Sequence, residues 1–233
     1  MWIKVSQRLF RKLSSHGIRG KVLSWISNWL KDRKQRVRIN GLFSQWKDVN
    51  SEIPQGSVLG PVLFNIFIND LTSGLNSEVA KFADNTKLFK IVKSKADREG
   101  LQRDLTKVGD WATQWQMIFN IDKCKVIHIG KNNPNYTFRM MGYKLAVITQ
   151  ERDLGVTVDG SLKSSAQCAA AVKKTNRMLV TIRKVIKNKT ENIIMPLYKY
   201  MVIPHFEYCI QFWSSHLKKD IMELEKFRKG QPR

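Results

Sequence analysis

Two short segments of the chain hold residue types that could do chemistry. The first is Phe82-Ala83-Asp84-Asn85, which lies between two stretches of strand-like sequence. A carboxylate at the tip of a tight hairpin is held rigidly and can be offered to a divalent metal ion. The same four residues could equally form an Asp-Asn turn with no function, and this segment alone favours that simpler interpretation.

The second segment is Pro54-Gln55-Gly56-Ser57, which precedes an apolar helical run. A glycine loop that leads into a helix exposes backbone N–H groups and lets a substrate approach the main chain. An ordinary junction between a loop and a helix is the commoner meaning of such a pattern. Taken by itself, this loop is therefore only a weak indication of a phosphate site.

The elements that must position these segments are helices and short strands. Apolar residues recur at helical spacing over 5–16, 20–32 and 95–115, and Ser57 can cap a helix that runs to about Leu71. Asn40-Gly41 between alternating runs predicts a β-hairpin. We also expect strands over 78–83 and 86–92 joined at Asp84-Asn85, short strands over 117–158, and mostly helices from Ser164 onward. The pattern predicts an α+β protein.

The charge is large and unevenly placed. The 233 residues include 41 Lys or Arg and 19 Asp or Glu, a net charge of +22. Residues 1–47 carry +11, residues 48–160 carry +1 and residues 161–233 carry +10. An excess of this size predicts a polyanionic partner, usually nucleic acid. Two basic flanks around a neutral centre could grip a phosphate backbone, or could be the ordinary surfaces of a basic protein.

Cysteine spacing and hydropathy bear on metal sites and compartment. Cys124, Cys168 and Cys209 are far apart and form no Cys-x-x-Cys pair, so neither a zinc site nor a disulfide framework is predicted. We find no secretory signal after Met1, and the longest uncharged run is too short and polar for a membrane span. The expectation is an intracellular protein of the nucleus or cytoplasm, without contact with a membrane.

Taken together and in order, the motifs resemble the reverse transcriptase of LINE-type retrotransposons, which lack long terminal repeats, in the jockey-like branch. The run from Ile53 to Pro61, with Pro54-Gln55-Gly56-Ser57, is similar to the family's template- and nucleotide-positioning motif. Phe82-Ala83-Asp84-Asn85 is similar to its Phe/Tyr-Ala-Asp-Asp hairpin. Further matches lie around Lys123, at Leu154-Gly155-Val156, and in the helical segment from Pro196 to Cys209.

The resemblance implies a right-hand polymerase: a palm with an antiparallel sheet and helices, partial fingers and a helical thumb. Residues 1–47 would be finger-side helices and hairpin, 48–160 the palm, and 161–233 the basic thumb-like region. Partners would be an RNA template, a DNA primer and deoxynucleoside triphosphates. The family's palm holds two ions, Mg²⁺ or Mn²⁺, about 3.5–4 Å apart.

The resemblance also implies roles for individual residues. Asp84 would be a catalytic metal ligand, Asn85 would stand beside it, and Lys123 would be a possible proton donor to pyrophosphate, with an ordinary surface lysine as the alternative. The nucleotide-positioning residues would be Pro54, Gln55, Gly56 and Ser57, and the primer grip would be Leu154, Gly155 and Val156.

This sequence departs from the family pattern at three places. Asn85 replaces a second aspartate, and Glu52 replaces a glycine beside the positioning loop. The first palm aspartate is not found, because Met1-Trp2-Ile3 occupies only the end of its motif, and Asp32, Asp48 and Glu52 are poorly placed substitutes. An N-terminally truncated copy with impaired catalysis is the expectation. The alternatives are a non-catalytic nucleic-acid-binding remnant and a decayed product without selected function.

Overall fold

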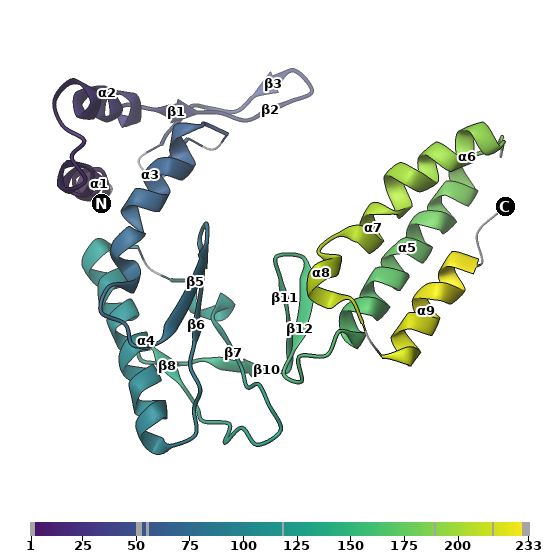
Figure 1. The fold of residues 1–233 in the computed structure, drawn as a ribbon. Coiled ribbons are helices and arrows are strands. Elements are labelled where there is room, and N and C mark those ends of the chain that lie inside the picture. The colour runs from purple at the N-terminus through teal and green to yellow at the C-terminus, as the bar shows by residue number, and fades with distance from the viewer. Residues whose placement is uncertain are drawn as a thin grey trace. The chain divides into compact units, whose positions relative to one another are not determined.

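The structure is a computed structural model that describes residues 3–49, 53–54, 56–117, 119–188, 190–215 and 217–229. The chain forms two compact units (Figure 1). Unit 1 consists of Met1–Cys124 and Tyr136–Leu145, and unit 2 consists of Lys125–Asn135 and Ala146–Arg233. The boundary expected between residues 48–160 and 161–233 lies inside unit 2, and the three-part division into fingers, palm and thumb remains a prediction.

Helices build the core of unit 1. They are α1 (Ile3–Ser15), α2 (Gly20–Leu30), α3 (Leu59–Phe67), α4 (Lys95–Trp115) and the 3₁₀ turns η1 (Asn69–Thr72) and η2 (Ile121–Lys123). The helical periodicity therefore predicted α1, α2 and α4 correctly. The helix expected from Ser57 to Leu71 is divided into α3 and η1. The core joins apolar residues of α1, α2 and α3, namely Leu9, Leu13, Ile26, Leu63 and Phe67, with Ile68.

The strands of unit 1 are short and antiparallel. β1 (Lys34–Gln35) pairs with β4 (Lys47–Asp48), β2 (Arg38–Ile39) with β3 (Leu42–Phe43), β5 (Glu78–Phe82) with β6 (Asn85–Phe89), and β8 (Arg139–Met140) with β9 (Tyr143–Lys144). The Asn40-Gly41 hairpin is confirmed: its two turn residues have φ of 49° and 85°, which suits a tight two-residue turn.

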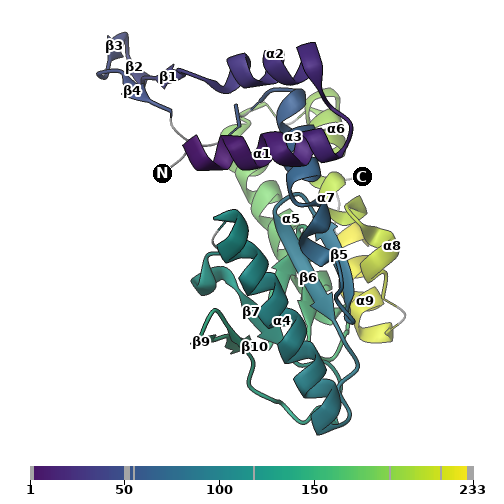
Figure 2. The same cartoon turned by 90° about the vertical axis from the view of Figure 1, so that its left-hand side faces the viewer.

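Unit 2 joins short strands to a helical region (Figure 2). β7 (Lys125–Ile127) runs parallel to β10 (Ala146–Ile148), whereas β11 (Gln150–Asp153) and β12 (Val156–Asp159) form an antiparallel hairpin. The helices are α5 (Ser165–Val185), α6 (Glu191–Leu197), the π-helix η3 (Tyr198–Val202), α7 (Pro204–Glu207), α8 (Ile210–Trp213) and α9 (Lys218–Lys229). A small core of Val156, Cys168, Ala171 and Trp213 joins β12, α5 and α8.

These elements confirm the α+β class. Within the described residues, five of the six strand pairs are antiparallel, and the parallel β7–β10 pair departs from the expected antiparallel sheet. Among the described helices, none combines the length and the apolar character that a membrane span requires.

Candidate functional site

Asp84 lies at the tip of the β5–β6 hairpin. Phe82 and Asn85 are the last residue pair of this ladder, so the turn consists of Ala83 and Asp84. The strand boundary predicted at Asp84-Asn85 was therefore one residue late, because Asn85 already pairs within β6. Ala83 has a φ of 50°, and Asp84 and Asn85 are both exposed. The carboxylate is thus presented to solvent from a short, paired scaffold.

A buried carboxylate on α4 holds the start of this hairpin. Asp104 is fully buried and accepts hydrogen bonds from the backbone N–H of Asn76, at 3.2 Å, and from the hydroxyl of Ser77, at 2.6 Å. Burial opposes ionisation of this group, but the hydrogen bonds from Ser77 and Asn76 and the charge of Lys90 outweigh it and lower the pKa of Asp104. Ionised Asp104 therefore anchors the residues that lead directly into β5.

A buried lysine, Lys12, joins α1, α3 and α4 in unit 1. Lys12 Nζ donates to the carbonyl of Phe67 and to Asp70 Oδ1, both at 2.5 Å. It also lies 3.8 Å from the ring centroid of Trp115 and 4.5 Å from that of Trp111. Burial lowers the pKa of Lys12, while the hydrogen bond and charge of Asp70 oppose that shift.

Neither Lys12 nor Asp104 was found by sequence reasoning. Lys12 lies between Leu9 and Leu13 on the apolar face of α1, and both leucines are buried. Asp104 is four residues before Val108, which is buried on the same face of α4. A charge inside an apolar stripe was therefore the signal that could have found both residues.

The predicted nucleotide-positioning loop caps α3. The N-cap residue of α3 is Val58, one position after the predicted Ser57, but the hydroxyl of Ser57 still accepts from the N–H of Gly60 at 3.0 Å and donates to the carbonyl of Pro54 at 2.7 Å. Gly56 is exposed with a φ of 80°. Gln55 lies outside the described residues, so its predicted role stays a prediction.

Gly60 shows how tightly this loop is folded. A Cβ at Gly60 would lie 2.9 Å from Ser57 Oγ, 3.1 Å from Ile53 Cγ2 and 3.2 Å from the carbonyl oxygen of Pro54. Ile53, Pro54 and Ser57 therefore lie close against the first turn of α3, and a residue with a Cβ at position 60 would force these neighbours to move.

Lys123 is the last residue of η2 and is exposed. In the described part of the chain, no hydrogen bond or ion pair joins it to Asp84 or Asn85. Its proposed role toward pyrophosphate therefore remains a prediction.

Of the predicted primer-grip residues, Leu154 and Gly155 form the β11–β12 turn of unit 2, and Val156 is the first residue of β12. Leu154 and Gly155 have φ of 45° and 88°, and Val156 is buried in the core beside Cys168 and Trp213. The hydroxyl of Tyr208 donates to the carbonyl of Leu154 at 2.7 Å. The turn is thus fixed to the helical part of unit 2.

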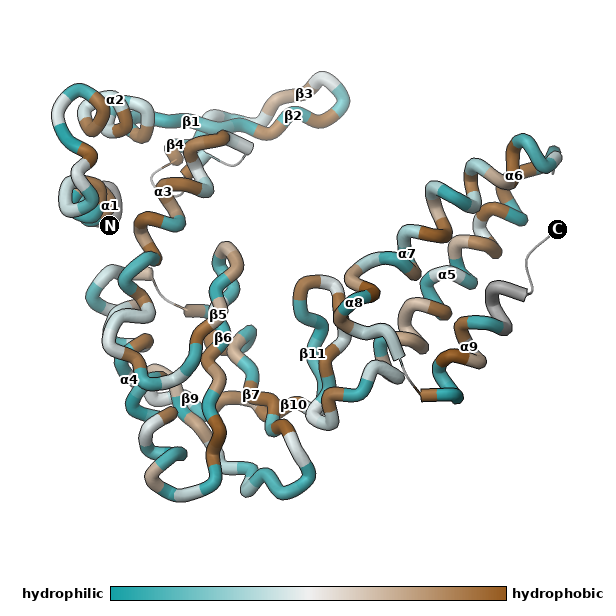
Figure 3. The backbone as a smooth tube through the Cα atoms, in the orientation of Figure 1, coloured by the Kyte–Doolittle hydropathy of each residue, from teal (hydrophilic) through white to brown (hydrophobic). Residues whose placement is uncertain are grey.

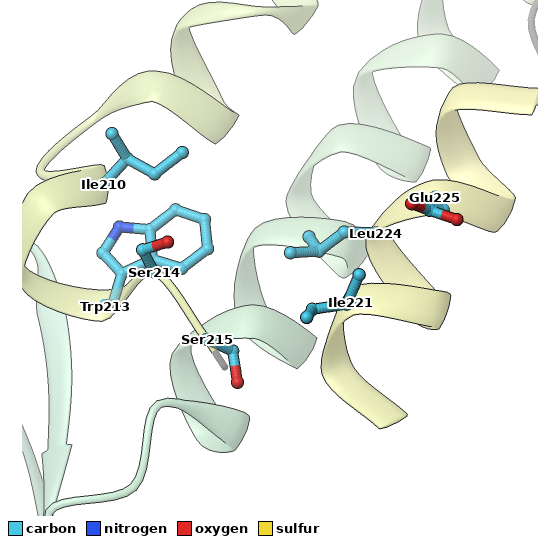
Figure 4. Close-up of a pocket in the computed structure, with 7 residues that line it drawn as sticks. All are labelled: Ile210, Trp213, Ser214, Ser215, Ile221, Leu224 and Glu225. Atoms are coloured by element: carbon cyan, nitrogen blue, oxygen red, sulfur yellow. The ribbon is translucent and has the colours of Figure 1, made fainter. Parts of the chain in front are cut away.

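A shallow hollow of about 250 Å³ lies elsewhere in unit 2, between α8 and α9. Figure 4 shows Trp213, Ile210, Ile221 and Leu224 around it. The buried carboxylate of Asp220 accepts hydrogen bonds from Ser165 and Ser215, both at 2.8 Å, and so joins the start of α5 to α9. We assign these contacts to the packing of the helices.

Metal ligation needs several oxygen donors at one place, commonly carboxylates. Within the described ranges, no three His, Cys, Asp or Glu side chains gather into such a group. Asp48 is instead 3.9 Å from Lys34 across the β1–β4 pair, and Asp32 is exposed. Glu52 lies outside the described residues. The described donors at the hairpin are thus the carboxylate of Asp84 and the neutral amide of Asn85.

Comparison with known proteins places these elements in one family. The family described as "Reverse transcriptase (RNA-dependent DNA polymerase)" matches residues 5–145. The chain is 25% identical over 224 residues to the probable RNA-directed DNA polymerase from transposon BS of Drosophila melanogaster, covering 86% of this chain and 24% of that protein. It is 28% identical over 232 residues to the RNA-directed DNA polymerase from mobile element jockey of Drosophila funebris, covering 88% of this chain and 24% of that protein.

The chain therefore spans about a quarter of the length of these curated relatives. The matched residues 5–145 contain the Ser57 loop and the Asp84 hairpin, whereas the Leu154-Gly155 turn follows them. Because the match covers more than half of the chain and agrees with the order of the motifs, this protein belongs to the reverse transcriptase family, among the LINE-type retrotransposon enzymes.

Proposed function

We propose that the chain is the template- and primer-binding part of a retrotransposon RNA-directed DNA polymerase, and that residues 1–233 by themselves do not polymerise DNA. In this proposal residues 1–47 act on the finger side, 48–160 form the palm and 161–233 form the thumb. The observation that carries the proposal is the hairpin tip, where Asp84 is exposed beside an amide, Asn85.

The described donor set does not fit a pair of divalent ions. Two-ion sites in polymerases position the attacking and leaving oxygens of an in-line displacement, and Mg²⁺ or Mn²⁺ prefers charged oxygen ligands. Replacing a carboxylate by an amide about 4 Å from an ion removes roughly 4 kcal/mol of attraction at an effective dielectric near 20. Asp84 remains the proposed metal ligand, but we derive no chemical step through a metal.

Nucleic-acid binding does not depend on the carboxylate charge that is absent at Asn85. Residues 1–47 and 161–233 carry net charges of +11 and +10. Cations in such numbers bind phosphates and release counterions, which makes the affinity fall steeply with salt. The loop Pro54-Gln55-Gly56-Ser57 would position the template and the incoming nucleotide. The Leu154-Gly155 turn would contact the primer strand.

Primer extension tests the catalytic half of this proposal. The purified chain is mixed with an RNA template, an annealed DNA primer and deoxynucleoside triphosphates, in Mg²⁺ and separately in Mn²⁺. We expect no extension above the level of an Asp84→Ala variant. Extension that disappears in Asp84→Ala would show that the hairpin is still a working catalytic site and would overturn the claim of impairment.

Filter binding or fluorescence anisotropy tests the binding half. The same primer–template duplex should bind with an affinity that falls steeply between about 50 and 200 mM salt. A weak or salt-independent interaction would contradict a polyanion-binding role. Asn85→Asp offers a complementary measurement, because restoring the carboxylate should tighten Mn²⁺ binding at the hairpin without changing duplex affinity.

A further inference from the structure

The hairpin that follows α2 has no core of its own. Every residue from 34 to 48 is exposed, and we call this segment the basic-aromatic arm. It is held together by the β1–β4 and β2–β3 ladders and by reciprocal hydrogen bonds between Val37 and Ser44. Figure 3 shows that the arm contains both hydrophilic and hydrophobic residues. An isolated two-stranded hairpin is only marginally stable in water. Burial in a core therefore does not account for the apolar residues of the arm.

One face of the arm combines flat aromatic rings with guanidinium groups. The guanidinium of Arg36 lies 3.8 Å from the ring centroid of Phe43 and 4.6 Å from that of Trp46. Arg38 lies 5.3 Å from the same phenylalanine ring. Phe43 and Trp46 are nevertheless 51% and 58% exposed, so much of each ring still faces solvent.

The strand register explains why both rings meet Arg36. Side chains three residues apart in a regular strand point to opposite faces. Gln35 pairs with Lys47, and Arg38 pairs with Phe43. Between these two pairs, the strand from Phe43 to Lys47 contains one residue more than the strand from Gln35 to Arg38. This extra residue is a bulge, a feature that redirects side chains. The bulge places the Trp46 ring on the same face of the hairpin as the Phe43 ring, where both contact Arg36.

The arm is also strongly basic. It carries Lys34, Arg36, Arg38 and Lys47, and its single acid, Asp48, lies near Lys34 at 3.9 Å. A partner that satisfies both features must offer negative charges and flat, stackable groups close together. A single nucleic-acid strand does so, because phosphates alternate with unpaired bases, whereas a duplex keeps its bases stacked inside.

We propose that the basic-aromatic arm binds unpaired nucleic acid by stacking bases on Phe43, Trp46 and the Arg36 guanidinium while Arg38 and Lys47 contact phosphates. The inference deepens the proposed function, on which it rests, by assigning the arm to the single-stranded part of the template and not to the primer–template duplex. Base–aromatic stacking tolerates any sequence because every base has a flat face.

Anisotropy with two labelled ligands tests the arm in the full chain. One ligand is an unstructured RNA of about 12 nucleotides, and the other is a blunt RNA–DNA duplex of the same length. The double variant Phe43→Ala/Trp46→Ala removes the rings and keeps every charge. We expect it to bind single-stranded RNA at least about tenfold more weakly, with an unchanged salt slope and less than a twofold change on the duplex.

Matched variants separate stacking from general effects. Leu42→Ala removes a side chain that is 79% exposed on the same hairpin and should leave both affinities unchanged. Trp46→Phe keeps a ring and should retain most of the single-strand affinity. The urea unfolding midpoint should not move in any variant, because the arm is outside the core.

The outcomes distinguish the two proposals. If Phe43→Ala/Trp46→Ala lost equal affinity for the single strand and the duplex, or lost none for either, the stacking inference would be overturned. The proposed function would still be supported by the duplex binding of the wild-type chain. A wild-type chain that binds neither ligand would overturn both. Loss of self-association, or of binding to anionic lipid vesicles, in Phe43→Ala/Trp46→Ala with unchanged RNA affinity would assign the rings to another partner and would also overturn the inference.

Discussion

The hydroxyl of Tyr208 donates a hydrogen bond to the carbonyl of Leu154, 2.7 Å away and 54 positions earlier in the chain. The Tyr208 ring also lies close to Gly155, the residue after Leu154. A Cβ at Gly155 would be 2.9 Å from Tyr208 Cε1. Trp213 Nε1 donates to the carbonyl of Tyr208 at 2.7 Å and fixes the backbone of that residue. The shape of the predicted primer-grip turn therefore depends on residues of the C-terminal helical region.

Gly155→Ala should destabilise unit 2. The residue has a φ of 88°, which strains any residue with a Cβ, and the new methyl group would meet the Tyr208 ring. We expect a loss of about 1–3 kcal/mol in the free energy of unfolding, measured by urea denaturation.

A double variant separates the two causes. In Gly155→Ala/Tyr208→Ala the ring is absent, so the alanine should cost less than it does in the wild-type background. If the cost is equal in both backgrounds, the contact between the ring and position 155 does not constrain the turn. Tyr208→Phe keeps the ring and isolates the hydrogen bond to Leu154.

Asp104→Asn should destabilise the protein at neutral pH and have a smaller effect in acid. The folded state lowers the pKa of Asp104, so the ionised form stabilises the fold above the unfolded value of about 3.9. That contribution is lost as the pH falls through the lower, folded value. We expect a cost of about 1–3 kcal/mol at neutral pH, measured as the difference in urea midpoints, and convergence with the wild type in strong acid.

Asp110→Asn is the matched control, because Asp110 is exposed on the same helix. It should change stability little at any pH. A constant difference between wild type and Asp104→Asn from neutral to strongly acidic pH would exclude ionised Asp104 as the anchor of the Asn76-Ser77 segment.

Patterns of local sequence predicted the elements well. The periodicity over 95–115 and the Asn40-Gly41 pair each predicted an element that the structure confirms, because helix amphipathicity and the left-handed turn preference of Asn-Gly are properties of neighbouring residues. The position of the Ala83-Asp84 turn was missed by one residue, since nothing local favours a left-handed alanine.

The supports of the site could not be predicted in the same way. The hydrogen bonds from Ser77 to Asp104 and from Tyr208 to Leu154 join residues 27 and 54 positions apart. A single sequence contains no signal for such pairings. The Asp84 hairpin and the Leu154-Gly155 turn were identified from motifs, whereas the groups that hold them required the fold.

Ser57→Ala should loosen the start of α3. The hydroxyl accepts from Gly60 and donates to Pro54, so its removal leaves a helix N–H without its acceptor and releases the preceding loop. We expect a loss of about 1 kcal/mol, seen in urea denaturation, together with faster amide exchange at Gly60. Ser57→Thr retains the hydroxyl and should recover most of the stability. Unchanged exchange at Gly60 in Ser57→Ala would contradict the capping role.

Lys12→Met should be less harmful than Lys12→Ala, although both remove the charge. Lys12 is 4% exposed, and its ammonium is held by the Phe67 carbonyl, Asp70 and two tryptophan rings. Methionine leaves the carbonyl without its donor but fills the same space against Trp111 and Trp115. Alanine adds a cavity at that place. We expect costs of about 1–3 kcal/mol for methionine and about 2–5 kcal/mol for alanine, measured as free energies of unfolding.

Lys21→Met provides the control, because Lys21 is exposed on α2 and its loss should change stability by less than about 0.5 kcal/mol. If Lys12→Met matched this control, the ammonium would contribute nothing beyond the packing of its stem. If both Lys12 variants cost the same, the cavity would be unimportant and the charge would dominate. We expect the loss in the free energy of unfolding to be smallest in Lys21→Met, intermediate in Lys12→Met and largest in Lys12→Ala. This order requires that the charge of Lys12 and the packing of its side chain both help to join α1 to α3 and α4.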